Sequence, residues 1–174
     1  AVLCYINQPQ LVDTPFMTTQ SQQVLGFDFG TKRIGVASGQ SLTQSTTELP
    51  PIKASDGTPN WQHLDALLNE WQPQALVVGI PLNMDNSISE MSRRARRFAN
   101  RIQDRYQLPC FIIDERLSTL EAKEIHYALG GSNNFREESV DGIAAQLILQ
   151  SWFNCDIRIP SHSRLEDHYV TNPA

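Results

Sequence analysis

The chain has 174 residues, of which 40% are hydrophobic and 19% are charged, as expected for one globular domain with a sizeable core. No apolar stretch approaches the length that spans a bilayer and no signal peptide is evident, so we expect no membrane segment. The net charge of −5 argues at first against a nucleic-acid partner. The three cysteines are far apart and lack zinc-site spacing, which indicates a reducing cytoplasm and no structural zinc.

The two ends of the chain lack a sustained hydrophobic pattern. Residues 1–23 and 156–174 are irregular in sequence and contain prolines. We expect both to be poorly ordered extensions, with Met17 as an alternative natural start. Residues 24–155 then form a single domain without an internal repeat.

The first predicted element is a buried β-hairpin. Apolar runs at 24–29 and 33–37 flank a tight turn, and Asp28 lies near the end of the first strand. Alternation places Asp28 on the same face as Gly26, between two phenylalanines that indicate burial of the other face. An ionised carboxylate there costs several kcal/mol unless it is paired. Two explanations remain open, a cation bound beside Asp28, where Gly26 leaves room, or hydrogen bonds from the turn backbone to Asp28.

The rest of the chain alternates strands and helices. A third strand is predicted at 42–47, followed by a loop rich in proline and glycine up to residue 59, and short buried strands at 75–80 and 110–113. Apolar residues at helical spacing, a capping box and a glycine pair predict helices at 61–71, 91–106, 118–129 and 140–153. The elements up to residue 129 have the order β-β-β-α-β-α-β-α, which predicts an α/β fold in which parallel strands lie beside an antiparallel meander.

Further acidic residues stand at the ends of predicted elements. Asp114 and Glu115 follow the strand 110–113, at the carboxyl end where open α/β sheets bind ligands. Adjacent strand residues point in opposite directions, and alternation alone does not choose between these two. Asp141 lies in the first turn of the last helix, in line with its apolar stripe, where it either joins a site or complements the helix dipole.

Acidic residues from three separate elements can converge on one site. Hard cations such as Mg²⁺ bind carboxylate oxygens and keep waters for substrate phosphates. Two such ions can activate a water and stabilise the leaving oxygen in phosphodiester cleavage. Without a cation, mutual repulsion would raise the pKa values of the carboxyl groups. The pattern is therefore typical of a divalent-metal site.

Four motifs together resemble the YqgF family: FDFGTKRIGVA, VVGIPLNMD, DERLST and VDGIAA. That family is similar to RuvC-type Holliday junction resolvases, and the match covers residues 24–153. It implies a ribonuclease H-like fold, with a mixed five-stranded sheet and helices on both faces. It also implies a metal-dependent nuclease that processes the 5′ end of pre-16S ribosomal RNA with Mg²⁺ or Mn²⁺, as two ions. The implied catalytic residues and metal ligands are Asp28, Glu115 and Asp141.

The chain departs from the wider superfamily at its second acid. Ribonuclease H-like nucleases usually carry this acid on the strand after the first helix. Here that strand ends Val78-Gly79-Ile80-Pro81, with no acid before Asp85. The resemblance therefore implies that Glu115, one strand later, takes the role.

Basic residues are unevenly distributed despite the negative net charge. Six of the 14 basic residues are arginines between positions 93 and 105, where Asp104 is the one acid. Guanidinium groups bind phosphate in a bidentate manner, although a solvated helix face explains the run equally well. Arg116 could contact the scissile phosphate or neutralise Asp114. The candidate nucleic-acid contacts are Arg93, Arg94, Arg97, Arg101, Arg116 and Lys32.

Other functions remain open beside rRNA processing. A Holliday junction resolvase would act on branched DNA, and a catalytically weak module would bind nucleic acid in ribosome assembly or transcription. The run 28–31 also resembles the first phosphate motif of the actin, Hsp70 and sugar kinase superfamily, whose members need two such domains. The expected partners are nucleic acid (precursor ribosomal RNA or branched DNA), ribosomal particles and a second copy of the chain, with no membrane, in the cytoplasm.

Overall fold

The computed structural model describes residues 21–115, 137–169 and 171, with the side chains of 137–141 excepted. The N-terminal extension up to residue 20, Arg116 and the helix predicted from 118 lie outside the described residues. None of the described helices is both long enough and apolar enough to cross a membrane.

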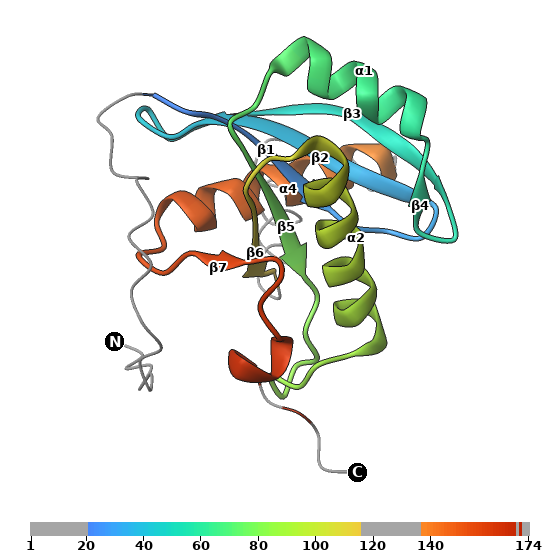
Figure 1. Cartoon of the computed structure of the whole chain (residues 1–174), viewed down its shortest axis with the longest axis vertical. Coiled ribbons are helices and arrows are strands. Elements are labelled where there is room, and N and C mark those ends of the chain that lie inside the picture. The colour runs from blue at the N-terminus through green and yellow to red at the C-terminus, as the bar shows by residue number, and fades with distance from the viewer. Residues whose placement is uncertain (1–20, 116–136, 170, 172–174) are drawn as a thin grey trace.

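A mixed β-sheet forms the centre of the molecule (Figure 1), and the described part of the chain gives it the strand order β4-β3-β2-β1-β5-β6-β7. Its strands are β1 (Gln23–Asp28), β2 (Arg33–Gln40), β3 (Ser45–Ser55), β4 (Thr58–Pro59), β5 (Ala75–Ile80), β6 (Cys110–Asp114) and β7 (Ile159–Pro160). Strands β1, β5 and β6 are parallel neighbours, whereas β2 and β3 continue the sheet antiparallel. The expected α/β class is confirmed, and the five expected strands are extended by the short β4 and β7.

Helices cover both faces of the sheet, as expected. Helices α1 (Trp61–Trp71) and α2 (Glu90–Tyr106) pack on one face, and α4 (Glu137–Phe153) packs on the other (Figure 1). Two apolar clusters result, which we call the α1/α2 cluster and the α4 cluster. Phe27 of β1 belongs to the first cluster and Val24 to the second, so β1 is buried on both faces. A 3₁₀ turn, η1 (Leu165–Asp167), follows β7.

Strand β3 differs from its prediction. It begins at Ser45 and continues to Ser55 through Pro50 and Pro51, so the third strand is present but its predicted bounds of 42–47 are wrong, as is the loop predicted from residue 50. Over most of its length β3 pairs with β2 alone, because β4 covers only Ala54 and Ser55. Proline has no N–H to donate and is tolerated on such an edge.

The chain after α4 is also more regular than predicted. Strand β7 pairs with β6, and Leu165 is only 2% exposed in the α1/α2 cluster. The guanidinium of Arg96 donates to the carbonyl groups of Ser163 and His162. The expectation of a poorly ordered tail is therefore wrong for residues 157–169, which are held by a strand pair and by side chains of α2.

Candidate active site

Asp28 ends β1 on the face of the sheet that α4 covers. Val24 packs in the α4 cluster and Phe27 in the α1/α2 cluster, so alternation turns Asp28 toward α4. Phe27 lies beside Val78 of the parallel strand β5. The following residue of β5, Gly79, is therefore level with Asp28 and faces the same side.

The register of β6 distinguishes Glu115 from Asp114. Ile113 packs against the α4 cluster, whereas Asp114 is level with Ile80 of the α1/α2 cluster. The backbone N–H of Glu115 donates to the carbonyl of Ile80 at 3.2 Å, so strand geometry continues to Glu115. Glu115 thus shares the α4 face with Ile113, and Asp114 faces the opposite side. The structure therefore shows which of the two acids lies on the same face as Asp28, a question that alternation in the sequence left open.

Asp28 and Glu115 come together although β5 separates their strands. The pKa of the Glu115 carboxyl lies well above its usual 4.5, and burial of this group is the largest cause. The negative charge of Asp28 and a hydrogen bond between the two side chains raise the pKa further, and the charge of Asp114 adds the smallest contribution. Glu115 as a residue is partly exposed, but its Oε2 atom is shielded from solvent. Without a cation, the two carboxyl groups titrate as a pair that retains a proton to higher pH than an isolated glutamate.

The space expected beside Gly26 is filled by protein. A Cβ atom on Gly26 would lie 2.5 Å from Cγ of Leu149 and 3.2 Å from the carbonyl oxygen of Ala145. The glycine therefore allows α4 to approach the sheet closely, and the space over Gly26 holds protein atoms. The carboxyl group of Glu115 lies beside Asp28.

Asp141 lies in α4, and its side chain is outside the described part of the structure. Along α4, Asp141 precedes Ala145 by one turn and Ile148 by two. Ala145 packs over Gly26, and Ile148 packs over Gly79. The backbone of Asp141 thus stands on the stripe of α4 that faces the acidic pair, one turn before the contact of Ala145 with Gly26.

The donor set suits a hard divalent cation. Two carboxyl groups lie in contact, with Oε2 of Glu115 shielded, and carboxylate oxygens are the ligands that Mg²⁺ and Mn²⁺ prefer. Within the described side chains, no group of three or more His, Cys, Asp or Glu residues is placed to hold a metal ion. A third carboxylate would have to come from outside the described side chains, and Asp141 is the candidate that the sequence supplies.

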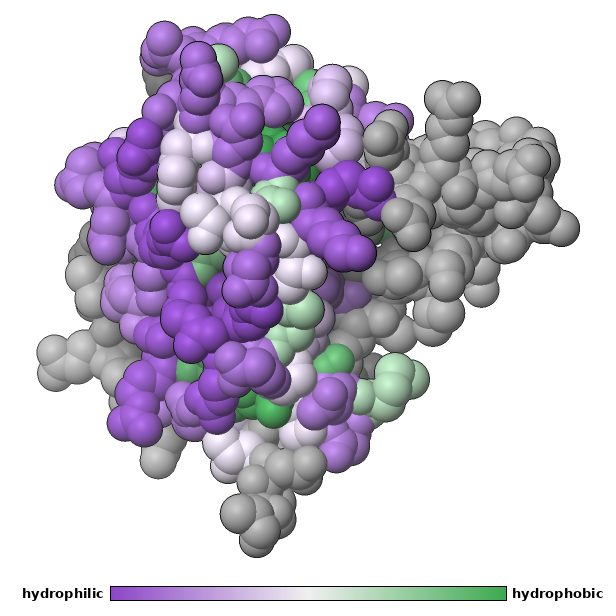
Figure 2. Space-filling view, turned by 90° about the vertical axis from the view of Figure 1, so that its right-hand side faces the viewer, coloured by the Kyte–Doolittle hydropathy of each residue, from purple (hydrophilic) through white to green (hydrophobic). Residues whose placement is uncertain are grey.

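The arginines of α2 are largely engaged within the protein. Hydrophilic residues dominate the view from the α2 side (Figure 2). The guanidinium ion pairs join Arg93 to Glu166 at 2.7 Å, Arg94 to Asp56 at 2.7 Å, Arg97 to Glu90 at 3.0 Å and Arg105 to Asp65 at 2.7 Å. The guanidinium of Arg101 lies 5.1 Å from the ring centroid of Trp61. Exposed ion pairs contribute about 0–1 kcal/mol each, so a phosphate group can displace them.

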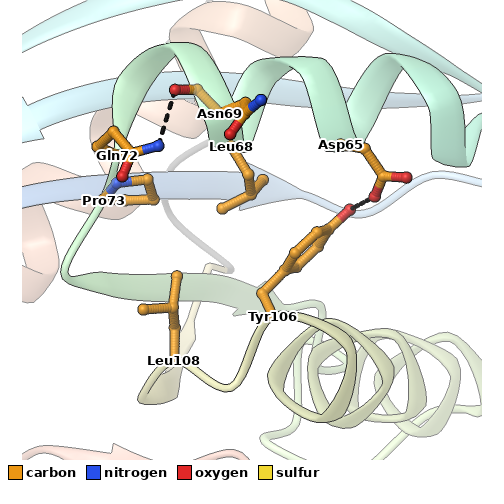
Figure 3. A pocket seen from close by; sticks show the side chains of 7 residues that line it. All are labelled: Asp65, Leu68, Asn69, Gln72, Pro73, Tyr106 and Leu108. Atoms are coloured by element: carbon orange, nitrogen blue, oxygen red, sulfur yellow. Dashed lines mark hydrogen bonds between the residues drawn. The ribbon is translucent and has the colours of Figure 1, made fainter.

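A hollow of about 430 Å³ lies between α1 and the end of α2, away from the acidic pair (Figure 3). Its lining includes Pro73, just before β5, and Leu108, just before β6, so it opens at the amino ends of the strands that carry the acids at their carboxyl ends. Beside it, Asp65 accepts hydrogen bonds from Arg105 and Tyr106, which lower the pKa of Asp65 to about 2. Sequence reasoning did not single out this network, which ties α1 to α2.

Comparisons with known proteins agree with the motifs. The family model described as "RuvX: Holliday junction resolvase" matches residues 22–155. A protein of Chromohalobacter salexigens named "Putative pre-16S rRNA nuclease" is 56% identical over 133 residues, which cover 76% of this chain and 90% of that protein. A protein of the same name from Saccharophagus degradans is 52% identical over 133 residues, with 76% and 94% coverage.

Among solved structures, "T. thermophilus RuvC in complex with Holliday junction substrate" aligns with a TM-score of 0.49 at 16% identity, covering 80% of this chain and 99% of that one. The family match spans nearly the whole predicted domain and confirms the resemblance drawn from the four motifs. The chain belongs to the RuvX family.

Proposed function

We propose that this protein is a metal-dependent nuclease that hydrolyses phosphodiester bonds, with pre-16S ribosomal RNA as its substrate. The observation that carries the proposal is the contact between the carboxyl groups of Asp28 and Glu115. Two carboxyl groups in contact repel each other when both are ionised, and a divalent cation bound to both relieves this repulsion. The names of relatives that are 56% and 52% identical support the choice of substrate.

The proposed catalytic residues and metal ligands are Asp28, Glu115 and Asp141. Two Mg²⁺ or Mn²⁺ ions, when bound, supply an activated water and stabilise the leaving oxygen. The protein keeps the carboxylates close together and excludes solvent from Oε2 of Glu115. The acidic pair must release its proton when cations bind, so metal affinity should fall as the pH falls.

The proposed phosphate contacts begin beside the acidic pair. Lys32 is exposed at the tip of the β1–β2 hairpin, directly after the strand that carries Asp28. Helix α2 starts at the same end of the sheet, since it follows the loop after β5. Three of its arginines stand one turn apart, and we call them the arginine stripe: Arg93, Arg97 and Arg101. Arg94, and Arg116 outside the described residues, complete the proposed set.

Branched DNA is the second candidate substrate, because the description of the family names a Holliday junction resolvase. A binding module without catalysis would keep the same basic contacts. Ribosomal particles and a second copy of the chain are the further partners proposed. The proposed compartment is the cytoplasm, where the free thiols of Cys110 and Cys155 would stay reduced.

A cleavage assay tests the proposal directly. Wild-type protein, the variant Asp28→Asn and the control Asp85→Asn are incubated with a 5′ precursor fragment of 16S rRNA or a four-way DNA junction, with Mg²⁺, Mn²⁺ or EDTA. Asp85 is exposed and hydrogen-bonded to Ser87, and it is not among the charges that raise the pKa of Glu115. We expect rRNA cleavage that needs a divalent ion and is lost only in Asp28→Asn. Cleavage of the junction alone would favour the resolvase, and binding without cleavage would favour the binding module.

A further inference from the structure

The second acid reaches its partner across a whole strand. Strand β5 lies between β1 and β6, and neighbouring strands are about 4.8 Å apart, so the backbones of β1 and β6 are roughly 10 Å apart. The carboxyl group of Glu115 nevertheless contacts that of Asp28. It must therefore pass over the residue of β5 that is level with Asp28 on the same face, which is Gly79.

Gly79 leaves the space that the Glu115 carboxyl group occupies. A Cβ atom on Gly79 would lie under 3.0 Å from Oε2 of Glu115, closer than Cβ atoms come to their neighbours. The same Cβ would lie 2.5 Å from Cδ1 of Ile148 on α4. Gly79 is thus covered by the carboxyl group of Glu115 and the end of the Ile148 side chain. Both are the far ends of flexible side chains.

We propose that Gly79 is a positioning residue of the nuclease site, because its missing side chain opens the passage through which Glu115 reaches Asp28. The expected effect on metal binding rests on the proposed function. The expected effect on the position of Glu115 rests only on the packing of the metal-free protein. Every residue of strand β5 is buried, so the space around its other residues is already taken up by neighbouring protein atoms. A methyl group at position 79 should push the Glu115 carboxyl group away from Asp28 and leave the strand in place.

The test compares Gly79→Ala with a glycine that lies under the same helix but touches no acid. A Cβ on Gly39 would lie 3.0 Å from the ring of Phe153 and 3.1 Å from Cδ1 of Leu149, both on α4. Calorimetric titration with Mn²⁺ should show at least a tenfold weaker affinity for Gly79→Ala. The control Gly39→Ala should stay within threefold of the wild type.

A second measurement uses metal-free protein in EDTA and needs no activity. The loss in urea midpoint caused by Gly79→Ala should at least halve in a Glu115→Ala background, because the space is then vacant. If Gly79→Ala lowers the urea midpoint equally in both backgrounds and Ile148→Ala removes this loss instead, the proposal is overturned and Gly79 serves helix packing. If Gly79→Ala does not fold, folding of the Gly79→Ala/Glu115→Ala double variant supports the proposal, and failure of the double variant overturns it. A wild type that binds no Mn²⁺ would refute the proposed function, while the urea comparison would still decide the role of Gly79.

Discussion

The raised pKa of Glu115 should make the stability of the metal-free protein depend on pH. In the unfolded chain this carboxyl group titrates near its usual 4.5, whereas in the folded protein its pKa lies well above that value. The folded state then holds the proton more tightly. The stabilisation is therefore complete below about pH 4.5 and is lost as the pH rises through the folded pKa. One proton gives a slope of at most about 1.4 kcal/mol of unfolding free energy per pH unit.

Two substitutions separate the causes of this slope. Glu115→Gln removes the titrating group, so its curve of unfolding free energy against pH should lack the fall between pH 5 and the folded pKa. Asp28→Asn removes the neighbouring charge but leaves the burial, which is the largest cause, so the fall should end at a lower pH. Above that pH, Asp28→Asn should be more stable than the wild type.

Urea unfolding in EDTA at half-unit steps from pH 5 to pH 8 measures these slopes. Asp85→Asn is the control, because the pKa of Asp85 is lowered by hydrogen bonds from Ser87 and this group does not titrate in that range. Its curve should run parallel to that of the wild type. If the Glu115→Gln curve is also parallel to the wild type, the contact between the two carboxyl groups does not govern the titration and our account of the site is refuted.

Three further predictions concern the acids, the arginines and the C-terminal segment. In the cleavage assay, Glu115→Gln should abolish activity. Asp114→Asn should lower activity far less, because Asp114 faces the α1/α2 cluster, and Asp85→Asn should leave activity nearly unchanged. A greater loss of activity in Asp114→Asn than in Glu115→Gln would mean that Asp114 is the ligand. Replacing the arginine stripe with glutamine should weaken binding to all nucleic-acid sequences alike. It should also flatten the salt dependence by at most about one unit of slope per lost phosphate contact. An unchanged slope would show that this face is merely solvated and does not contact phosphate. Leu165→Ala should lower the unfolding free energy by about 2–5 kcal/mol in urea, against less than about 0.5 kcal/mol for Leu42→Ala, because Leu165 is 2% exposed and Leu42 is 66% exposed; equal losses would contradict the packing of this segment.

The central elements could be predicted because their signals are local. Strand β5 is a short apolar run between a proline and a turn, and its predicted bounds are those of the structure. Helix α1 has apolar residues at helical spacing, and it ends before Pro73. In both cases burial, periodicity and breakers agree, so neighbours in space were not needed to place the element. The acidic residues at strand ends were found by the same local reasoning.

Features that depend on pairing could not be predicted from the sequence. The two prolines in β3 are compatible with a strand only because β3 pairs with β2 alone at these positions, as β4 covers only Ala54 and Ser55. Strand β7 has only two residues and forms against β6, about 50 positions earlier in the chain. The choice between Asp114 and Glu115 likewise required the register of β6 against β5. The role of Gly79 follows only from the side chain that crosses it.

The run of arginines shows why a charge pattern alone does not define a binding surface. The acids that pair with Arg93 and Arg105 are far away in the sequence, so the run looks unpaired until the chain folds. A phosphate group that replaces such an acid leaves a carboxylate that must recover a counterion, so the net release of ions is smaller than one per contact. Arg101 stacks on Trp61, and no carboxylate of the described residues is placed against it. Arg101→Gln should therefore flatten the salt dependence of nucleic-acid binding more than Arg97→Gln, whose guanidinium starts from a bond to Glu90. Equal effects of these two exposed residues would show that intramolecular pairing does not limit how α2 binds phosphate.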